Sequence, residues 1–123
     1  MANRLIQISV VYFVISVGLG LYMSIAHAYD LSPVHVHVNL LGWMSLALAG
    51  VIYSLYPKLA STKLAKAHFW LHNISLPVMM LGLAFVIKEV NGAVPFVSIS
   101  SIVLVIAIIL FAINILMNLN KNQ

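Results

Sequence analysis

The sequence predicts an all-α protein, a four-helix bundle that crosses a membrane. Hydrophobic residues make up 63% of the 123 residues and charged residues only 7%, and the mean hydropathy is +1.11. A soluble domain of this length cannot bury so much apolar surface, so the composition indicates an integral membrane protein. The apolar residues also fall into four stretches of about 24 residues, each about 36 Å long as a helix and so able to span a bilayer.

The first two stretches cover residues 5–28 and 33–56. The polar start of the chain runs into the first stretch without a small-residue cleavage site, so we expect a retained helix and not a removed signal peptide. The second stretch begins at Pro33, a favoured first helical residue, and Ser32 is predicted to cap it. This second helix is expected to end at the Tyr56-Pro57 step.

The last two stretches cover residues 64–87 and 94–117. Asn91-Gly92 and Pro95 separate them, as turn residues do. Pro77 lies inside the third stretch and is predicted to kink it, which neighbouring helices in a membrane tolerate. We therefore expect residues 1–123 to form a single transmembrane domain with up-down-up-down topology.

The basic residues predict the orientation of the bundle. The two ends of the chain and the loop between the second and third helices carry Arg4, Lys58, Lys63, Lys66 and Lys121, whereas the opposite loops hold Asp30 and the neighbours Lys88 and Glu89. The positive-inside rule then places both termini in the cytoplasm (N-in, C-in). The net charge of +4 reflects this topology, so no nucleic-acid partner is expected. A bacterial inner membrane is the expected location.

Composition also excludes several kinds of chemistry. The chain has no cysteine, which excludes disulfides, thiolate metal sites and iron–sulfur clusters. Asp30 and Glu89 are its only acidic side chains, and they lie far apart in the sequence, so a paired-carboxylate mechanism within one subunit is not expected. Ionisable residues within membrane spans usually mark functional sites, which directs attention to the five histidines.

Three histidines, His27, His35 and His37, crowd the junction between the first two helices, near the predicted outer face. On a helix, His35 and His37 point about 200° apart, so they cannot bind one metal ion and instead serve two sides. Asn39, one turn after His35, is placed to hydrogen-bond its ring or a nearby carbonyl. The alternative is that these histidines are interfacial and wetted by headgroups. Small residues on the same helix allow a flat ring or another helix to approach closely: Gly42, Ser45, Ala49 and Gly50.

A second pair, His68 and His72, lies four residues apart on one face of the third helix, near the predicted inner face. This spacing suits a metal ion or a haem ligand, although packing at the interface is an alternative for His68. The predicted depths of His72 and His37 differ by roughly 16 Å, which favours two separate sites.

Other polar and aromatic residues have structural interpretations. Tyr53, Tyr56 and Trp70 are expected in an inner aromatic belt and Tyr29 in an outer one. Asn114 and Asn118 are expected to form interhelical hydrogen bonds. The adjacent Met79 and Met80 are interpreted as lipid-facing or packing residues, not as copper ligands.

The segment HAYDLSPVHVHVNLLGW at 27–43, the helix end Tyr53-x-x-x-Pro57 and the helix start His68-Phe69-Trp70 resemble the catalytic subunit of cbb-type cytochrome c oxidases. The NO-reductase and NnrS-like branches of the haem–copper oxidase superfamily are similar in outline. The resemblance covers roughly residues 10–90. It implies that His35 binds a high-spin haem iron, that His37 binds a low-spin haem iron and that His27 contacts haem propionates.

This chain also departs from that family. A complete oxidase subunit has many more helices, and those that supply the copper ligands, the cross-linked tyrosine and the second low-spin haem ligand have no counterpart here. Turnover as a terminal oxidase is therefore not expected, and whether the protein is an enzyme stays open.

We expect an integral membrane protein that binds haem b. Its expected function is to transfer electrons, or to sense or handle NO or O2. Its expected partner is a redox protein in the first case and the diatomic gas in the second. Four helices hardly enclose two macrocycles, so a homo-oligomer is expected. One alternative is a membrane protein that binds copper or zinc through His27, His35 and the pair His68 and His72. The other is a non-catalytic, oxidase-like assembly subunit.

Overall fold

The computed structural model describes residues 1–120, and this part of the chain is helical throughout, with short turns and no strand. Its elements are α1 (Ala2–Ala26), η1 (Tyr29–Leu31), α2 (Ser32–His37), η2 (Val38–Met44), α3 (Ser45–Leu55), α4 (Pro57–Ala60), α5 (Lys63–Ile87) and α6 (Val94–Asn118). Four segments are long and apolar enough to cross a membrane: Ala2–Ala26, Tyr29–Leu55, Lys63–Ile87 and Val94–Asn118. The expectation of four apolar helices of membrane-spanning length is confirmed.

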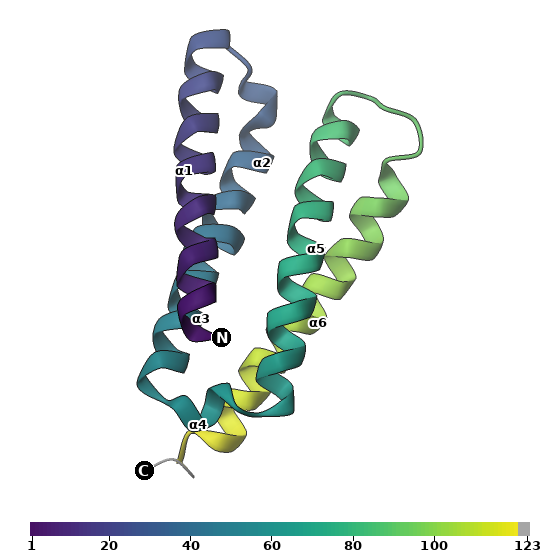
Figure 1. The fold of residues 1–123 in the computed structure, drawn as a ribbon. Helices are drawn as coiled ribbons and strands as arrows, with labels where there is room; N and C mark the ends of the chain where they lie inside the picture. The colour runs from purple at the N-terminus through teal and green to yellow at the C-terminus, as the bar shows by residue number, and fades with distance from the viewer. Residues whose placement is uncertain (121–123) are drawn as a thin grey trace.

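The helices form two hairpins (Figure 1). In the first, α1 lies beside the continuous helical segment α2–η2–α3, and in the second α5 lies beside α6. The short helix α4 connects the hairpins at one end of the molecule. At the opposite end, Lys88 Nζ forms an ion pair with Asp30 Oδ2 at 2.7 Å. The hairpins are thus joined through the chain at the α4 end and by charge at the other.

Two glycines bring α1 close to its partner helix. A Cβ atom at Gly42 would lie 2.7 Å from Cγ of Tyr12, and one at Gly50 would lie 2.7 Å from Cγ1 of Ile6. Neither position has room for a larger side chain. Of the two roles expected for the small residues of this segment, the close approach of another helix is confirmed.

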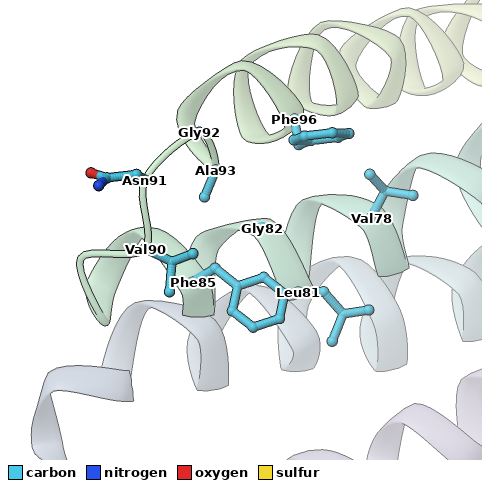
Figure 2. Close-up of a pocket in the computed structure, with 9 residues that line it drawn as sticks. All are labelled: Val78, Leu81, Gly82, Phe85, Val90, Asn91, Gly92, Ala93 and Phe96. Carbon is cyan, nitrogen blue, oxygen red and sulfur yellow. The ribbon is translucent and has the colours of Figure 1, made fainter.

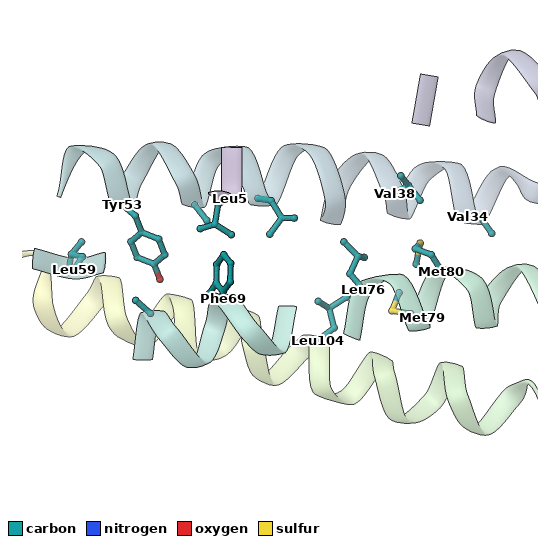
Figure 3. Packing of buried hydrophobic residues seen from close by; sticks show 13 residues of the cluster. Leu5, Val34, Val38, Tyr53, Leu59, Phe69, Leu76, Met79, Met80 and Leu104 are labelled. Carbon is teal, nitrogen blue, oxygen red and sulfur yellow. The ribbon is translucent and has the colours of Figure 1, made fainter. Parts of the chain in front are cut away.

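The core lies where the two hairpins meet (Figure 3). Tyr53 and four leucines are almost fully buried there, and Met79 and Met80 are also buried, so the methionines are packing residues, as expected. In contrast, Ile25 is 72% exposed and Leu116 is 82% exposed. Such outward apolar side chains suit contact with lipid. The buried leucines are Leu5, Leu46, Leu59 and Leu76.

Helix boundaries differ from the expected ones at several ends. The first helix spans Ala2–Ala26, not 5–28, because His27 adopts a left-handed conformation (φ 53°, ψ 31°) that ends it. Ser32 is not an N-cap, and that prediction is wrong: its hydroxyl donates to the carbonyl of Tyr29 at 2.7 Å, and Leu31 occupies the cap position. Thr62 caps α5 by accepting from the amide of Ala65 at 3.0 Å.

The second membrane-length helix contains a stretch of π-helix, η2, directly after His37. The sequence did not predict it. A π-helix shifts the hydrogen-bond ladder and changes which side-chain groups its carbonyls can reach, and such turns are frequent at functional sites. Here the carbonyl of Leu40 accepts from the hydroxyl of Ser45 at 2.7 Å, and the carbonyl of Leu41 accepts from His72 at 2.9 Å.

Candidate functional site

The five histidines lie in two places. His27, His35 and His37 belong to the turn between the first two long helices and to α2, whereas His68 and His72 lie on α5 in the core. Within residues 1–120, no three histidine, aspartate or glutamate side chains come close enough together to hold a metal ion. Each histidine is therefore considered with its own partners.

His27 is exposed and does not join the other two histidines of its group. It ends α1 in the left-handed conformation, and its ring centre lies 6.0 Å from that of Tyr29. This position agrees with a contact at the membrane surface more than with a ligand inside the bundle.

His35 faces α1. Its Nδ1 atom lies 3.4 Å from Oγ of Ser16, which is fully buried, and its ring packs against Gly20, where a Cβ would lie 3.0 Å from Cε1 of His35. The small residues Ser16 and Gly20 make the space that the imidazole fills. Asn39 does not take part, since no hydrogen bond joins it to His35 in the part of the chain that the structure describes.

His37 is half-buried, and within residues 1–120 its one hydrogen bond stays within its own helix. Nδ1 lies 2.6 Å from the carbonyl oxygen of Pro33, one turn earlier. A carbonyl can only accept, so Nδ1 carries the proton and donates it. In the neutral ring the lone pair is then on Nε2. His35 packs on α1, whereas His37 bonds to the Pro33 carbonyl of its own helix. That the two rings serve different sides of the helix stays a prediction.

His72 is 1% exposed and reaches from α5 to the first hairpin. Its Nε2 atom donates to the carbonyl of Leu41 at 2.9 Å. Its Nδ1 atom is buried and has no hydrogen-bond partner within residues 1–120. By the same tautomer argument Nδ1 carries a lone pair. A buried polar atom without a hydrogen bond is rare and calls for an explanation.

His68 is buried beside His72 at 2% exposure. The two ring centres lie 5.3 Å apart, with their planes at 85°. The hydroxyl of Tyr53 lies 3.5 Å from Nδ1 of His68, and Phe111 of α6 packs on the same ring with the centres 4.9 Å apart. Figure 3 shows the Tyr53 hydroxyl pointing from α3 toward α5 and α6. The burial of His68 in the core does not agree with the alternative of packing at the membrane interface.

The prediction that Tyr53 belongs to an inner aromatic belt is wrong. Tyr53 is only 1% exposed and lies in the core. Trp70, in contrast, is 59% exposed, as a belt residue should be. The pattern of aromatic residues near a helix end could not separate the two, because burial depends on where α5 and α6 cross α3.

The hydrogen bond from His72 shows how far along the helices of the first hairpin this side chain lies. Leu41 follows His37 by four residues, about 6 Å along the helix, so His72 binds the first hairpin about one turn from His37. This offset is smaller than the roughly 16 Å expected from residue positions along the two helices. Residue positions alone do not include the tilt of one hairpin relative to the other.

A second polar group surrounds Asn114, which is fully buried on α6. Its Oδ1 accepts from the hydroxyl of Thr62 at 2.9 Å, and its Nδ2 donates to the carbonyl of Leu59 at 3.1 Å. Asn118 donates to the same Oδ1 at 3.1 Å. The expected interhelical hydrogen bonding of Asn114 is confirmed, and it ties α6 to the segment around α4.

Charged groups lie at the ends of the helices. The exposed Lys88–Asp30 pair holds the pKa of Lys88 above its usual value of 10.5, because the carboxylate accepts a hydrogen bond from the ammonium group. Lys121, one of the basic residues used for the orientation, lies outside the described residues.

Apolar hollows open on the surface of the bundle. One, of about 490 Å³, lies between α1, α2 and α5, and Tyr12 and Pro77 are among its lining residues. Another, of about 340 Å³, lies between α5 and α6 beside Gly92 and Phe96 (Figure 2). No histidine lines either one. A cofactor held by these histidines would therefore bind elsewhere than in these two hollows.

Sequence reasoning missed Ser16, Tyr53 and the carbonyl of Leu41 as partners of the histidines. A small or polar residue in an apolar helix was the only available signal for Ser16. Nothing in the sequence marked Leu41, since a backbone carbonyl has no side-chain signal and the π-helical stretch that contains it was not predicted.

No protein-family model matches this chain, and no solved structure matches it. The resemblance to cbb-type oxidases therefore rests on the sequence motifs at 27–43, 53–57 and 68–70.

Proposed function

We propose that this protein is an integral membrane haem b protein that transfers electrons or handles a diatomic gas such as NO or O2. The observation that carries the proposal is the hydrogen bond of His37. Its Nδ1–H donates to the Pro33 carbonyl at 2.6 Å, which leaves Nε2 as a lone-pair donor with a fixed ring. Histidines that bind metals usually have their other ring nitrogen held in this way.

The donor set fits a haem at His37 better than at His35. The His37 hydrogen bond lies at an exposed position, whereas α1 covers the His35 ring at Ser16 and Gly20. A flat macrocycle needs a free face, and packing against Ser16 and Gly20 takes up the α1 side of the His35 ring. We therefore assign His37 as the residue that would hold the haem iron. His35 then serves as a contact between α1 and α2, and it could bind the iron only if the two helices separated.

When bound, haem supplies one-electron chemistry if two histidines ligate it, or gas binding if one position stays open. The chain contributes the orientation of the His37 ring through Pro33. It also contributes an apolar surface that keeps water away, and membrane anchoring by four spans. Terminal oxidase turnover is not proposed, because the copper-ligand helices of the oxidases have no counterpart.

The orientation that we propose follows the basic residues. Arg4 and the lysines around α4 place this end in the cytoplasm, with both termini, in an up-down-up-down arrangement. His37 then lies near the outer face, and the exposed His27 at the end of α1 is available to a propionate. Proteins of the bacterial inner membrane show this asymmetry of basic residues between their loops, and we propose this location.

A homo-oligomer is part of the proposal. Only 17% of the most apolar window of α1 and of α6 is buried within one chain, so both helices offer large faces to lipid or to another copy. A second copy placed against His37 would enclose the haem and could supply its other ligand.

A spectrum of the full chain, expressed with added haem and purified in detergent, tests the proposal. We expect a Soret band in the wild type, its loss in His37→Ala and its retention in Ser98→Ala, a control on α6 whose hydroxyl donates to the Val94 carbonyl of its own helix. Adding CO or NO to the reduced protein shifts the band if one position is open and leaves it in place if two histidines bind. A wild-type protein without a Soret band would overturn the assignment.

A further inference from the structure

The geometry points to a second site, at His68 and His72, that binds a copper or zinc ion without haem. It does not depend on the proposed haem at His37, because the two sites use different residues. The site lies where Tyr53, His68 and His72 meet in the core, each of them at most 2% exposed.

Each of the two imidazoles is held at one nitrogen by the protein. His72 donates from Nε2 to the Leu41 carbonyl at 2.9 Å, so its Nδ1 keeps a lone pair, buried and without a partner in the described residues. His68 Nδ1 lies 3.5 Å from the Tyr53 hydroxyl oxygen. In the tautomer that donates from Nδ1 to this oxygen, Nε2 keeps the lone pair and is the second metal-binding atom. Metal-binding histidines usually show this arrangement, with one nitrogen anchored and the other available.

The spacing of the rings suits a shared metal ion. A zinc–nitrogen bond of about 2.0–2.1 Å puts each ring centre about 3.2 Å from the metal, so two rings at a tetrahedral angle have centres about 5.2 Å apart. The observed separation is 5.3 Å, with the planes nearly perpendicular at 85°. Two histidines in the i, i+4 relation on one helix face can reach this geometry without moving the backbone.

The donor atoms select the class of metal. Imidazole nitrogen suits copper and zinc, whereas magnesium and calcium need several oxygen ligands. The chain contains no cysteine, and its acidic residues, Asp30 and Glu89, lie at the other end of the bundle from α4. The site therefore offers two nitrogen ligands and leaves the other positions of the metal open to a small ligand.

His68 is the member of the pair that lies nearer the α4 end. It lies five residues into α5, about 7.5 Å from the start of the helix. Polar side chains also lie at this end, with Thr62 hydrogen-bonded to Asn114 of α6. We expect an ion to enter from this end, where polar groups can replace part of its water.

Metal binding to the haem-free full chain tests the inference. The purified protein is stripped with a chelator, offered Zn²⁺ or Cu²⁺ separately, desalted and analysed by elemental mass spectrometry. We expect about one ion per wild-type chain, at least a tenfold weaker affinity in His68→Ala and in His72→Ala, and wild-type binding in His37→Ala. Wild-type binding in both α5 variants would overturn the inference, and so would no binding by the wild type.

Two further measurements cover the case in which the variants fold poorly. Circular dichroism and gel filtration show whether His68→Ala and His72→Ala keep the wild-type fold. The electron paramagnetic resonance spectrum of Cu²⁺ bound to the wild type needs no variant. Coupling to imidazole nitrogens is expected, and a spectrum without nitrogen coupling would contradict the site. Loss of the Soret band in His37→Ala with metal binding intact separates this site from the proposed haem site.

Discussion

At the scale of single residues, Gly42 and Gly18 are helical glycines with opposite surroundings. A Cβ at Gly42 would lie 2.7 Å from Cγ of Tyr12, whereas a Cβ at Gly18 would meet nothing within 4 Å. Alanine is the better helix former by about 1 kcal/mol. We therefore expect Gly18→Ala to keep or raise the Tm in detergent. Gly42→Ala should destabilise the protein by about 1–3 kcal/mol, because the ring of Tyr12 must move.

Thermal unfolding of the two variants in the same detergent checks this expectation. The Gly18 variant controls for the general effect of replacing glycine by alanine in a membrane helix. Equal Tm values for Gly18→Ala and Gly42→Ala would mean that α1 does not pack on η2 at Tyr12.

The candidate residues could be selected from the sequence, but not their partners. His68 and His72 stood out because ionisable side chains in an apolar chain are costly, and their i, i+4 spacing placed them on one face. Which ring nitrogen is free depends on Tyr53 and Leu41. These lie on another helix, and the sequence of α5 carries no information about them.

At the scale of elements, Thr62 and Asn114 connect the start of α5 to α6. Thr62 accepts from the Ala65 amide at 3.0 Å and donates to Asn114 Oδ1 at 2.9 Å. Loss of an N-cap side chain costs about 1 kcal/mol, and an interhelical hydrogen bond in a membrane contributes about 0.6–2 kcal/mol. We therefore expect Thr62→Ala and Asn114→Ala each to lower stability by about 1–2 kcal/mol.

A double-mutant cycle measured by unfolding in mixed micelles isolates the contact between these two residues. The double variant should be less destabilised than the sum of the single variants, because the shared hydrogen bond is lost only once. Ser98→Ala is the control, since its hydroxyl bonds only to the Val94 carbonyl of its own helix. Strict additivity would show that Thr62 and Asn114 do not interact.

The existence of the helices could be predicted better than their interior. Runs of apolar residues and the breaks at Pro57 and Asn91-Gly92 located the four spans to within a few residues. The π-helical stretch η2 (Val38–Met44) was missed, because no residue type marks it. Within it the carbonyl of Leu41 accepts from His72 of α5, a tertiary contact that the sequence of this helix does not indicate.

At the scale of the whole molecule, two hairpins are joined through α4 and by the Lys88–Asp30 ion pair at the opposite end. Composition predicted four spans, yet it gave no indication that α1 would pair with α2–α3 and α5 with α6. The glycines at 42, 50 and 82 fit this pairing, since each sits where the partner helix of its own hairpin comes closest. Contacts between the hairpins instead use larger side chains and the polar groups of His72 and Asp30.

The ion pair should therefore make the association of the hairpins depend on pH. Asp30 raises the pKa of Lys88 above 10.5, so the charged lysine is favoured in the folded state. The resulting stabilisation is complete below the unfolded pKa of 10.5 and is lost as the pH rises through the higher folded value. We expect Asp30→Asn to lower the Tm slightly at pH 7, and the difference from wild type to shrink at high salt and above the folded pKa of Lys88.

Glu89→Gln, which changes a neighbouring carboxylate outside the ion pair, is the control and should show no such pH-dependent difference. A Tm difference for Asp30→Asn that stays constant with both pH and salt would mean that the ion pair does not hold the hairpins together.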